Sequence, residues 1–125
     1  MMRFENPLVL VADVSAATDF YTNTLQLSVR ERHDDFVLFD HGFAIHHGPS
    51  LLESAGIDGP ATNQPWGRNN VVLYFQTAEP GALFEEIRGR CAIVHPPRKE
   101  RWGETLFRIR DVDGHLIEIG DGERL

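Results

Sequence analysis

Cysteine is nearly absent from this chain, which has only Cys91 among its 125 residues. A single cysteine excludes an intramolecular disulfide. The residues that follow it, Ala92, Ile93 and Val94, are apolar, and this setting predicts a thiol packed as a small hydrophobic side chain in a strand. A reducing, cytoplasmic location is therefore expected.

Long apolar runs and clustered basic residues are also missing. No segment approaches the length that crosses a membrane, and the N-terminal residues have no hydrophobic stretch typical of a signal peptide. There are 12 basic against 19 acidic residues, a net charge of -7, and the basic residues are scattered apart from Arg98, Lys99 and Arg101. We expect neither a membrane nor a nucleic-acid partner. With 42% hydrophobic residues, the chain can close the core of one domain.

What the chain does contain is an internal repeat. Residues 42–48 and 114–120 share Gly, Ile and Gly at the same three places, with an offset of 72 residues. Upstream, Asn6 and Phe20 match Asn70 and Phe84 with an offset of 64 residues. The second copy has therefore gained about eight residues, which we place in a turn at 96–103. A duplicated unit predicts two similar halves that face each other across a shared groove.

The hydrophobic pattern gives the same order of elements twice. A β-branched run is followed by a helix, for which Asp13 or Ser15 offers a cap in the first half. Three strands then follow, and the short turns between them in the first half require antiparallel hairpins. We expect strands at 6–12, 27–33, 36–40, 43–47, 70–76, 91–95, 105–110 and 115–119, and helices at 16–25 and 80–89.

The motif Arg110-Asp-Val-Asp-Gly-His-Leu-Ile-Glu118, with Val11-Ala-Asp13, Phe20-Tyr21 and Trp102-Gly103, resembles the vicinal oxygen chelate superfamily. This superfamily includes glyoxalase I, bleomycin-resistance proteins, extradiol dioxygenases and fosfomycin-resistance transferases. The resemblance covers nearly the whole chain. It does not choose among these activities, because one fold hosts isomerases, oxygenases, transferases and plain binding proteins.

The resemblance implies an α+β fold in which two tandem βαβββ modules form a cupped mixed sheet around a cavity. The single domain, 1–125, would comprise a first module at 1–55, a connector at 56–69 and a second module at 70–125. Members of the superfamily usually form homodimers.

Catalytic members typically hold a divalent metal with one side chain from the first and one from the last strand of each module. Carried over, these places fall on Asn6, His46, Asn70 and Glu118. Only His46 and Glu118 are good ligands for Mn, Ni, Zn or Fe, because a neutral amide oxygen is a weak donor. A strong metal site is therefore not expected. A shift of either first strand by one residue would place Glu5 or Asn69 inward instead.

The inner face offers a mixed lining for a small organic molecule. If Asn6 and Asn70 point inward, alternation along the strands brings Leu8, Val72 and Tyr74 with them. Residues 96–103 would form a flap whose Trp102 either stacks on a planar ligand or simply covers a strand end. Arg108 would contact an anionic ligand, although its alternation with apolar neighbours favours a solvated outer face.

His46 and Glu118 support two interpretations. If they meet across the cavity, they form a general acid and base; otherwise they line the pocket as a satisfied polar contact. Two functions follow. The favoured one is a metal-free protein that binds or sequesters a small organic ligand. The alternative is a glyoxalase-like lyase or isomerase, or an extradiol-type dioxygenase, that uses His46 and Glu118 with a divalent metal, or as acid and base without one.

Overall fold

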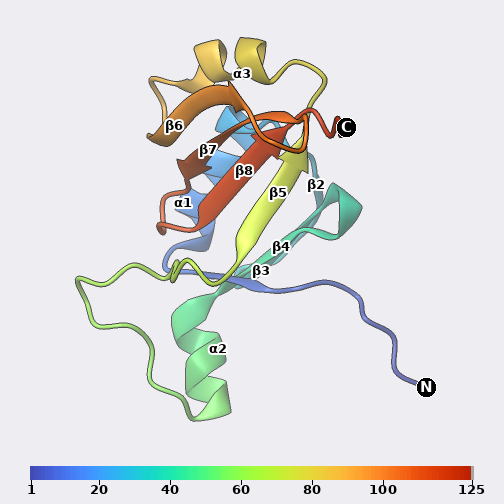
Figure 1. Cartoon of the computed structure of the whole chain (residues 1–125). Coiled ribbons are helices and arrows are strands. Elements are labelled where there is room, and N and C mark those ends of the chain that lie inside the picture. The colour runs from blue at the N-terminus through green and yellow to red at the C-terminus, as the bar shows by residue number, and fades with distance from the viewer. Residues whose placement is uncertain (125) are drawn as a thin grey trace. The chain divides into compact units, whose positions relative to one another are not determined.

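The computed structural model describes residues 1–124, which pack as two compact units divided between Trp66 and Gly67. We call them the first and second modules (Figure 1). The first module has a four-stranded sheet in the order β1-β4-β3-β2. Its strands are β1 (Val9–Val11), β2 (Val29–Arg32), β3 (Phe36–Phe39) and β4 (Ala44–His47), and its helices are α1 (Val14–Asp19), the π-helical turn η1 (Phe20–Thr24), the 3-10 turn η2 (Asp40–Gly42) and α2 (Gly48–Ala55).

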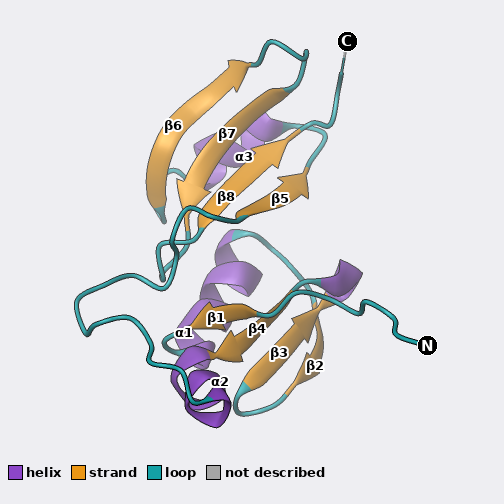
Figure 2. Ribbon diagram, turned by 60° about the horizontal axis from the view of Figure 1, so that its bottom comes forward, coloured by secondary structure: helices purple, strands orange, loops and turns teal. Residues whose placement is uncertain are grey.

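The second module repeats this sheet in the order β5-β8-β7-β6, as Figure 2 shows. One helix packs against it. The elements are β5 (Val72–Gln76), α3 (Pro80–Ile87), β6 (Ala92–Lys99), β7 (Thr105–Arg110) and β8 (Leu116–Gly120). In each sheet the first and last strands are parallel, and the remaining pairs are antiparallel. The α+β class and the two tandem modules are therefore confirmed.

Strand register confirms the internal repeat. In the first module Val9 pairs with Ile45, and in the second Leu73 pairs with Ile117. The first members of these pairs lie 64 residues apart and the second members 72, the two offsets found in the sequence. The duplication has therefore preserved the pairing of first and last strands to the residue.

Each module has its own core between one face of its sheet and its helix. In the first, Tyr21 is fully buried, and its ring centre lies 4.8 Å from that of Phe43 and 5.8 Å from that of Phe39. In the second, Phe84 of α3 meets Phe107 of β7 edge-to-face with ring centres 5.3 Å apart. The repeat-related Phe20 and Phe84, 7% and 6% exposed, are both core residues, as a shared fold requires.

The expected helices and strands are present, with three differences. The first helix begins after Asp13, whose carboxylate accepts from Ala16 N at 3.0 Å, but it is α-helical only to Asp19 and then continues as η1. Helix α2 was not expected, although Pro49 in its first turn and the left-handed Gly56 at its end are its sequence signals. Strand β6 runs to Lys99, so Pro96 and Pro97 lie in an edge strand rather than in a flap.

The motif that is most specific to the superfamily forms a tight turn. Asp111 is 6% exposed, and its Oδ1 accepts from the backbone N–H groups of Asp113 at 2.9 Å and His115 at 2.8 Å. Gly114 has a φ of 83°, a conformation that favours glycine. A Cβ on Gly67 would overlap the backbone of Gly114, so the second module begins against this turn. The motif thus has a structural role.

Residues 1–124 contain no helix that combines the length and apolar character needed to cross a membrane.

We predict that Asp111→Ala lowers the free energy of unfolding by about 1–3 kcal/mol, because two backbone N–H groups lose the buried carboxylate that accepts from them. Urea unfolding measures the loss. The control is Val112→Ala, since Val112 lies in the same turn but is 58% exposed and should change stability little. Equal effects of the two substitutions would contradict the role given to Asp111.

Candidate functional site

The face of the second sheet opposite α3 carries a row of polar side chains. Buried Leu73, Ile117 and Ile109 pair across β5, β8 and β7. Because side chains alternate along a strand, the next residues point to the opposite face. On that face Tyr74 pairs with Glu118, Glu118 with Arg108, and Arg108 with His95 of β6. We call this set the polar row; it consists of Tyr74, Glu118, Arg108 and His95.

Arg108 is the centre of the polar row. Its Nε and one terminal nitrogen contact Glu118 Oε1 at 2.9 and 2.8 Å. Its other terminal nitrogen lies 2.9 Å from His95 Nε2 and 3.4 Å from Glu100 Oε1. The Arg108 and Glu118 side chains are only 20% and 18% exposed. The expectation that Arg108 occupies a solvated outer face is therefore wrong, since it is half-buried and paired.

The hydrogen bonds around Arg108 fix the tautomer of His95 and the pKa of Glu100. His95 Nδ1 lies 2.8 Å from the carbonyl oxygen of Pro96, so Nδ1 carries the proton and Nε2 accepts from Arg108. Glu100 is bound by Arg98 at 3.0 Å, and this hydrogen bond lowers the pKa of Glu100 despite its partial desolvation. Two guanidinium groups thus balance two carboxylates, Glu100 and Glu118.

A second group of polar side chains lies around Glu104, which is only 2% exposed. One carboxylate oxygen accepts from Trp102 Nε1 at 3.0 Å, and the other from the Tyr74 hydroxyl and from Gly122 N at 3.0 Å. Burial would raise the pKa of Glu104, but these hydrogen bonds outweigh it and the pKa falls below its ordinary value. Glu104 is therefore a buried carboxylate with three donors.

Tyr74 links the Glu104 group to the polar row. Its hydroxyl donates to Glu104 and accepts from Gln76 Nε2 at 2.9 Å. Desolvation and the nearby carboxylates of Glu104 and Glu118 raise the pKa of the phenol. Tyr74 is consequently a neutral hydrogen-bond donor at neutral pH and is not suited to act as a general base.

The equivalent face of the first module is different in character. There Leu10, His46 and Phe36 pair in register, where the second module has Tyr74, Glu118 and Arg108. The His46 side chain is 19% exposed. Its Nδ1 lies 3.0 Å from the carbonyl oxygen of His47, and its Nε2 lies 3.8 Å from Asp35. The duplicated faces have therefore diverged, one to an apolar surface with a histidine and the other to an ionic network.

The two asparagines precede their strands. Asn6 lies three residues before β1, and its amide donates to the carbonyl oxygen of Pro7 at 2.9 Å. Asn70 is exposed and lies two residues before β5. Leu8, expected to line the cavity, is 44% exposed just outside β1. Within the strands the expected alternation holds, because Val9, Val11 and Leu73 are buried while Val72 and Tyr74 are 46% and 45% exposed.

The donor set does not fit a tightly bound divalent metal. Glu118, the carboxylate at the superfamily's ligand position, is held by Arg108, and a metal would have to displace that guanidinium. Asn6 and Asn70 add only neutral amides, which zinc and iron rarely use. Among the residues that the structure describes, no group of three or more His, Cys, Asp or Glu side chains is placed to hold a metal ion.

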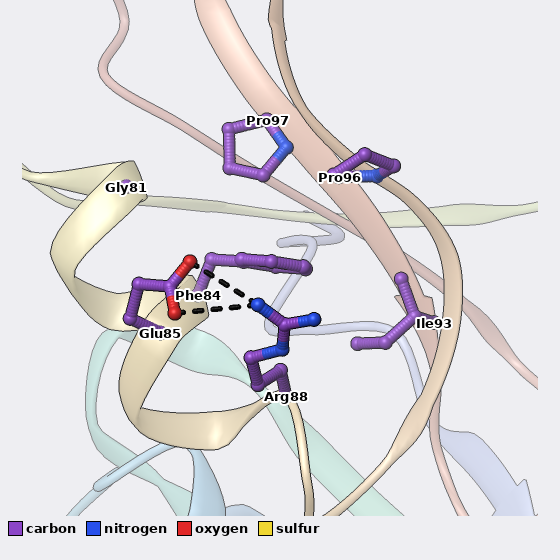
Figure 3. A pocket seen from close by; sticks show the side chains of 7 residues that line it. All are labelled: Gly81, Phe84, Glu85, Arg88, Ile93, Pro96 and Pro97. Carbon is purple, nitrogen blue, oxygen red and sulfur yellow. Dashed lines mark hydrogen bonds and ion pairs between the residues drawn. The ribbon is translucent and has the colours of Figure 1, made fainter.

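A surface groove lies between α3 and β6, on the helix-covered face of the second sheet (Figure 3). Its volume is about 490 Å³. Arg88 extends across it, with its guanidinium 5.4 Å from the Phe84 ring centre and 3.3 Å from Glu85. The apolar lining comes from Phe84, Ile93, Pro96 and Pro97. None of the predicted site residues belongs to this groove.

Comparison with known proteins identifies the class. Residues 4–123 match the family model described as a glyoxalase-like domain. A protein of unknown function from Agrobacterium tumefaciens is 40% identical, with 98% of this chain and 96% of that chain covered and a TM-score of 0.88. No curated protein matches the chain.

More distant structures share the fold. A glyoxalase/bleomycin resistance protein/dioxygenase from Nocardioides is 18% identical, with a TM-score of 0.76 over 99% of this chain and 88% of that one. A lactoylglutathione lyase from Agrobacterium tumefaciens is 19% identical, with a TM-score of 0.68 over 96% and 93% of the two chains. The fold is that of the vicinal oxygen chelate superfamily. Within it, the chain belongs to the glyoxalase-like domain family.

Sequence reasoning missed Glu104, His95 and Glu100. Glu100 lies in the segment expected to be a flap, Glu104 follows that segment, and His95 is the last residue of the strand expected at 91–95. A signal for Glu104 was present, since it directly follows the superfamily's Trp102-Gly103 pair. Its importance arises only because β5 and residue 122 bring their donors to it.

We predict that Gly120→Ala lowers the free energy of unfolding by about 1–3 kcal/mol, because the new Cβ would overlap the Glu104 carboxylate. Gly81→Ala is the matched control, since nothing lies within 4 Å of its Cβ position in α3 and alanine favours a helix. Chemical denaturation of both variants checks this prediction. If Gly120→Ala left the free energy of unfolding unchanged, Glu104 would not be packed against Gly120 as described.

We also predict that Arg108→Leu destabilises the protein by about 2 kcal/mol, because the half-buried Glu118 loses its partner. The double variant Arg108→Leu/Glu118→Leu should recover most of this loss, since both charges are then absent. A double-mutant cycle of unfolding free energies measures the coupling. Additive losses would mean that the two side chains do not interact.

Proposed function

We propose that this protein binds a small organic ligand at the open face of the second sheet, without a metal. The observation that carries the proposal is the ion pair between Arg108 and Glu118. It occupies the carboxylate that would otherwise serve as a metal ligand, and it leaves hydrogen-bonding groups of both charges at a half-buried surface. Beside it, Val72 and Tyr74 are nearly half exposed and provide apolar contact area.

The chemistry of the polar row suits a ligand with both polar and apolar parts. Arg108 and Arg98 offset Glu118 and Glu100, so neither sign of charge dominates and a neutral polar group would be accepted. Side chains that already bond to one another are preorganised, and a ligand that meets them loses less entropy on binding. This combination of a few fixed polar groups with an apolar wall is typical of small-molecule sites.

The alternative is a metal-dependent enzyme that uses His46 and Glu118, either a lyase or isomerase or an extradiol-type dioxygenase. The name of the lactoylglutathione lyase with the same fold suggests this activity. His46 supports the alternative in part, because its Nε2 lies 3.8 Å from Asp35, farther than a hydrogen bond reaches. The engagement of Glu118 by Arg108 opposes it, and we favour the binding function.

Thermal unfolding separates the two functions, because a ligand that binds the folded state raises the melting temperature. We expect no rise with Mn²⁺, Ni²⁺, Zn²⁺ or Fe²⁺, and a rise of several degrees with members of a panel of small organic compounds in the presence of a chelator. Near-stoichiometric metal in the purified protein, lost in His46→Ala, would overturn the proposal. So would turnover of a thiol hemiacetal or a catechol that Glu118→Gln abolishes.

A further inference from the structure

The Glu104 group adds a specificity to this site, and the inference rests on the proposed function. Tyr74 contributes to the open face, and Trp102 precedes β7 at one end of the same sheet. The two oxygens of one buried carboxylate tie these rings together, one accepting from the indole N–H and the other from the phenol. Their positions are therefore set by the protein rather than by a ligand.

The polar atoms of both rings are committed within the protein. The Tyr74 hydroxyl donates to Glu104 and accepts from Gln76, so it has already formed both kinds of hydrogen bond. The indole N–H of Trp102 has one hydrogen to give, and Glu104 accepts it at 3.0 Å. Neither ring can donate a hydrogen bond to a ligand without losing its bond to Glu104.

Two glycines allow this arrangement. A Cβ on Gly120 of β8 would overlap the Glu104 carboxylate. Gly122 has a φ of 75°, and a Cβ there would lie 2.7 Å from Gln76 Nε2. Because these two positions have no side chain, the Glu104 carboxylate and the Gln76 amide can lie against the backbone. Gly122 N supplies the third donor to Glu104. The group is thus built from β5, β8, residues 102–104 and the C-terminal segment together.

What remains accessible is the ring surface. Tyr74 is 45% exposed although its hydroxyl is engaged, and Val72 on the same face of β5 is 46% exposed. Trp102 is partly exposed, although the Arg124 guanidinium lies over its ring at 5.9 Å from the centre. Aromatic surfaces of this kind attract rings by stacking and edge contacts.

We infer that Glu104 is a positioning residue that commits the polar atoms of Tyr74 and Trp102, and that the ligand places an uncharged aromatic or aliphatic ring against these two side chains. The polar part of the ligand then meets Arg108, Glu118 and His95. This assigns opposite ends of one ligand to the Glu104 group and to the centre of the polar row.

The test uses the full chain and N-phenyl-1-naphthylamine, an uncharged ring compound whose fluorescence increases in apolar sites. Tyr74→Ala should raise its Kd by about 3- to 10-fold, because a ring contact is lost. Tyr74→Phe should restore most of the affinity, since the hydroxyl does not contact the ligand. Glu104→Gln should weaken binding about 3-fold or more, because one carboxylate oxygen becomes an amide nitrogen that accepts no hydrogen bond, and one of the two rings loses its acceptor. Val112→Ala is the control, because the Val112 side chain is exposed and lies in the turn between β7 and β8.

The outcomes separate this inference from the proposed function. Probe binding that Tyr74→Ala and Glu104→Gln leave unchanged would overturn the inference, and so would a Tyr74→Phe variant as weak as Tyr74→Ala. Failure of the native protein to bind the probe would also overturn the inference. The metal and organic-compound titrations above decide the proposed function independently. If Glu104→Gln does not fold, the two Tyr74 variants still decide the inference.

Discussion

Parallel pairing of the first and last strands is the constraint on which the rest of each module depends. It fixes which residues face the helix and which face away, because a slip of one residue would exchange the two faces. In the second module this register places Tyr74 beside Glu118, and antiparallel pairing of β8 with β7 then adds Arg108. Pairing of β6 with β7 adds His95, and the polar row follows from these three pairings.

Duplication kept this register while the exposed faces diverged. Core positions are under the same packing constraint in both modules, so Ile45 and Ile117 are alike and both buried. The opposite faces carry no such constraint, and the places of His46 and Phe36 are taken by Glu118 and Arg108 in the second module. The half-buried carboxylate of Glu118 on β8 needs a partner, and the guanidinium of Arg108 on the adjacent strand β7 supplies it.

Much of the fold could be predicted from the sequence, because alternation and capping are local signals. The strand at 105–110 and the cap at Asp13 are where they were expected. Residues 96–99 were wrongly assigned to the turn, since two prolines are typical of a turn and only an edge position lets them lie in a strand. For the candidate site, the sequence pointed to Glu118, Tyr74 and Arg108 as candidates, but not to the pairing of Arg108 with Glu118.

The sequence by itself determined the duplication, the α+β class and the resemblance to the superfamily, because these depend on spacing along the chain. The weakness of the metal-ligand set also followed from residue types alone. Only the tertiary structure decided which charges meet. Glu104 finds its donors on Tyr74, Trp102 and Gly122, which lie 30, 2 and 18 residues away. Hydrogen bonds between distant residues depend on strand register and on glycines at the positions of close approach, and no local sequence pattern encodes them.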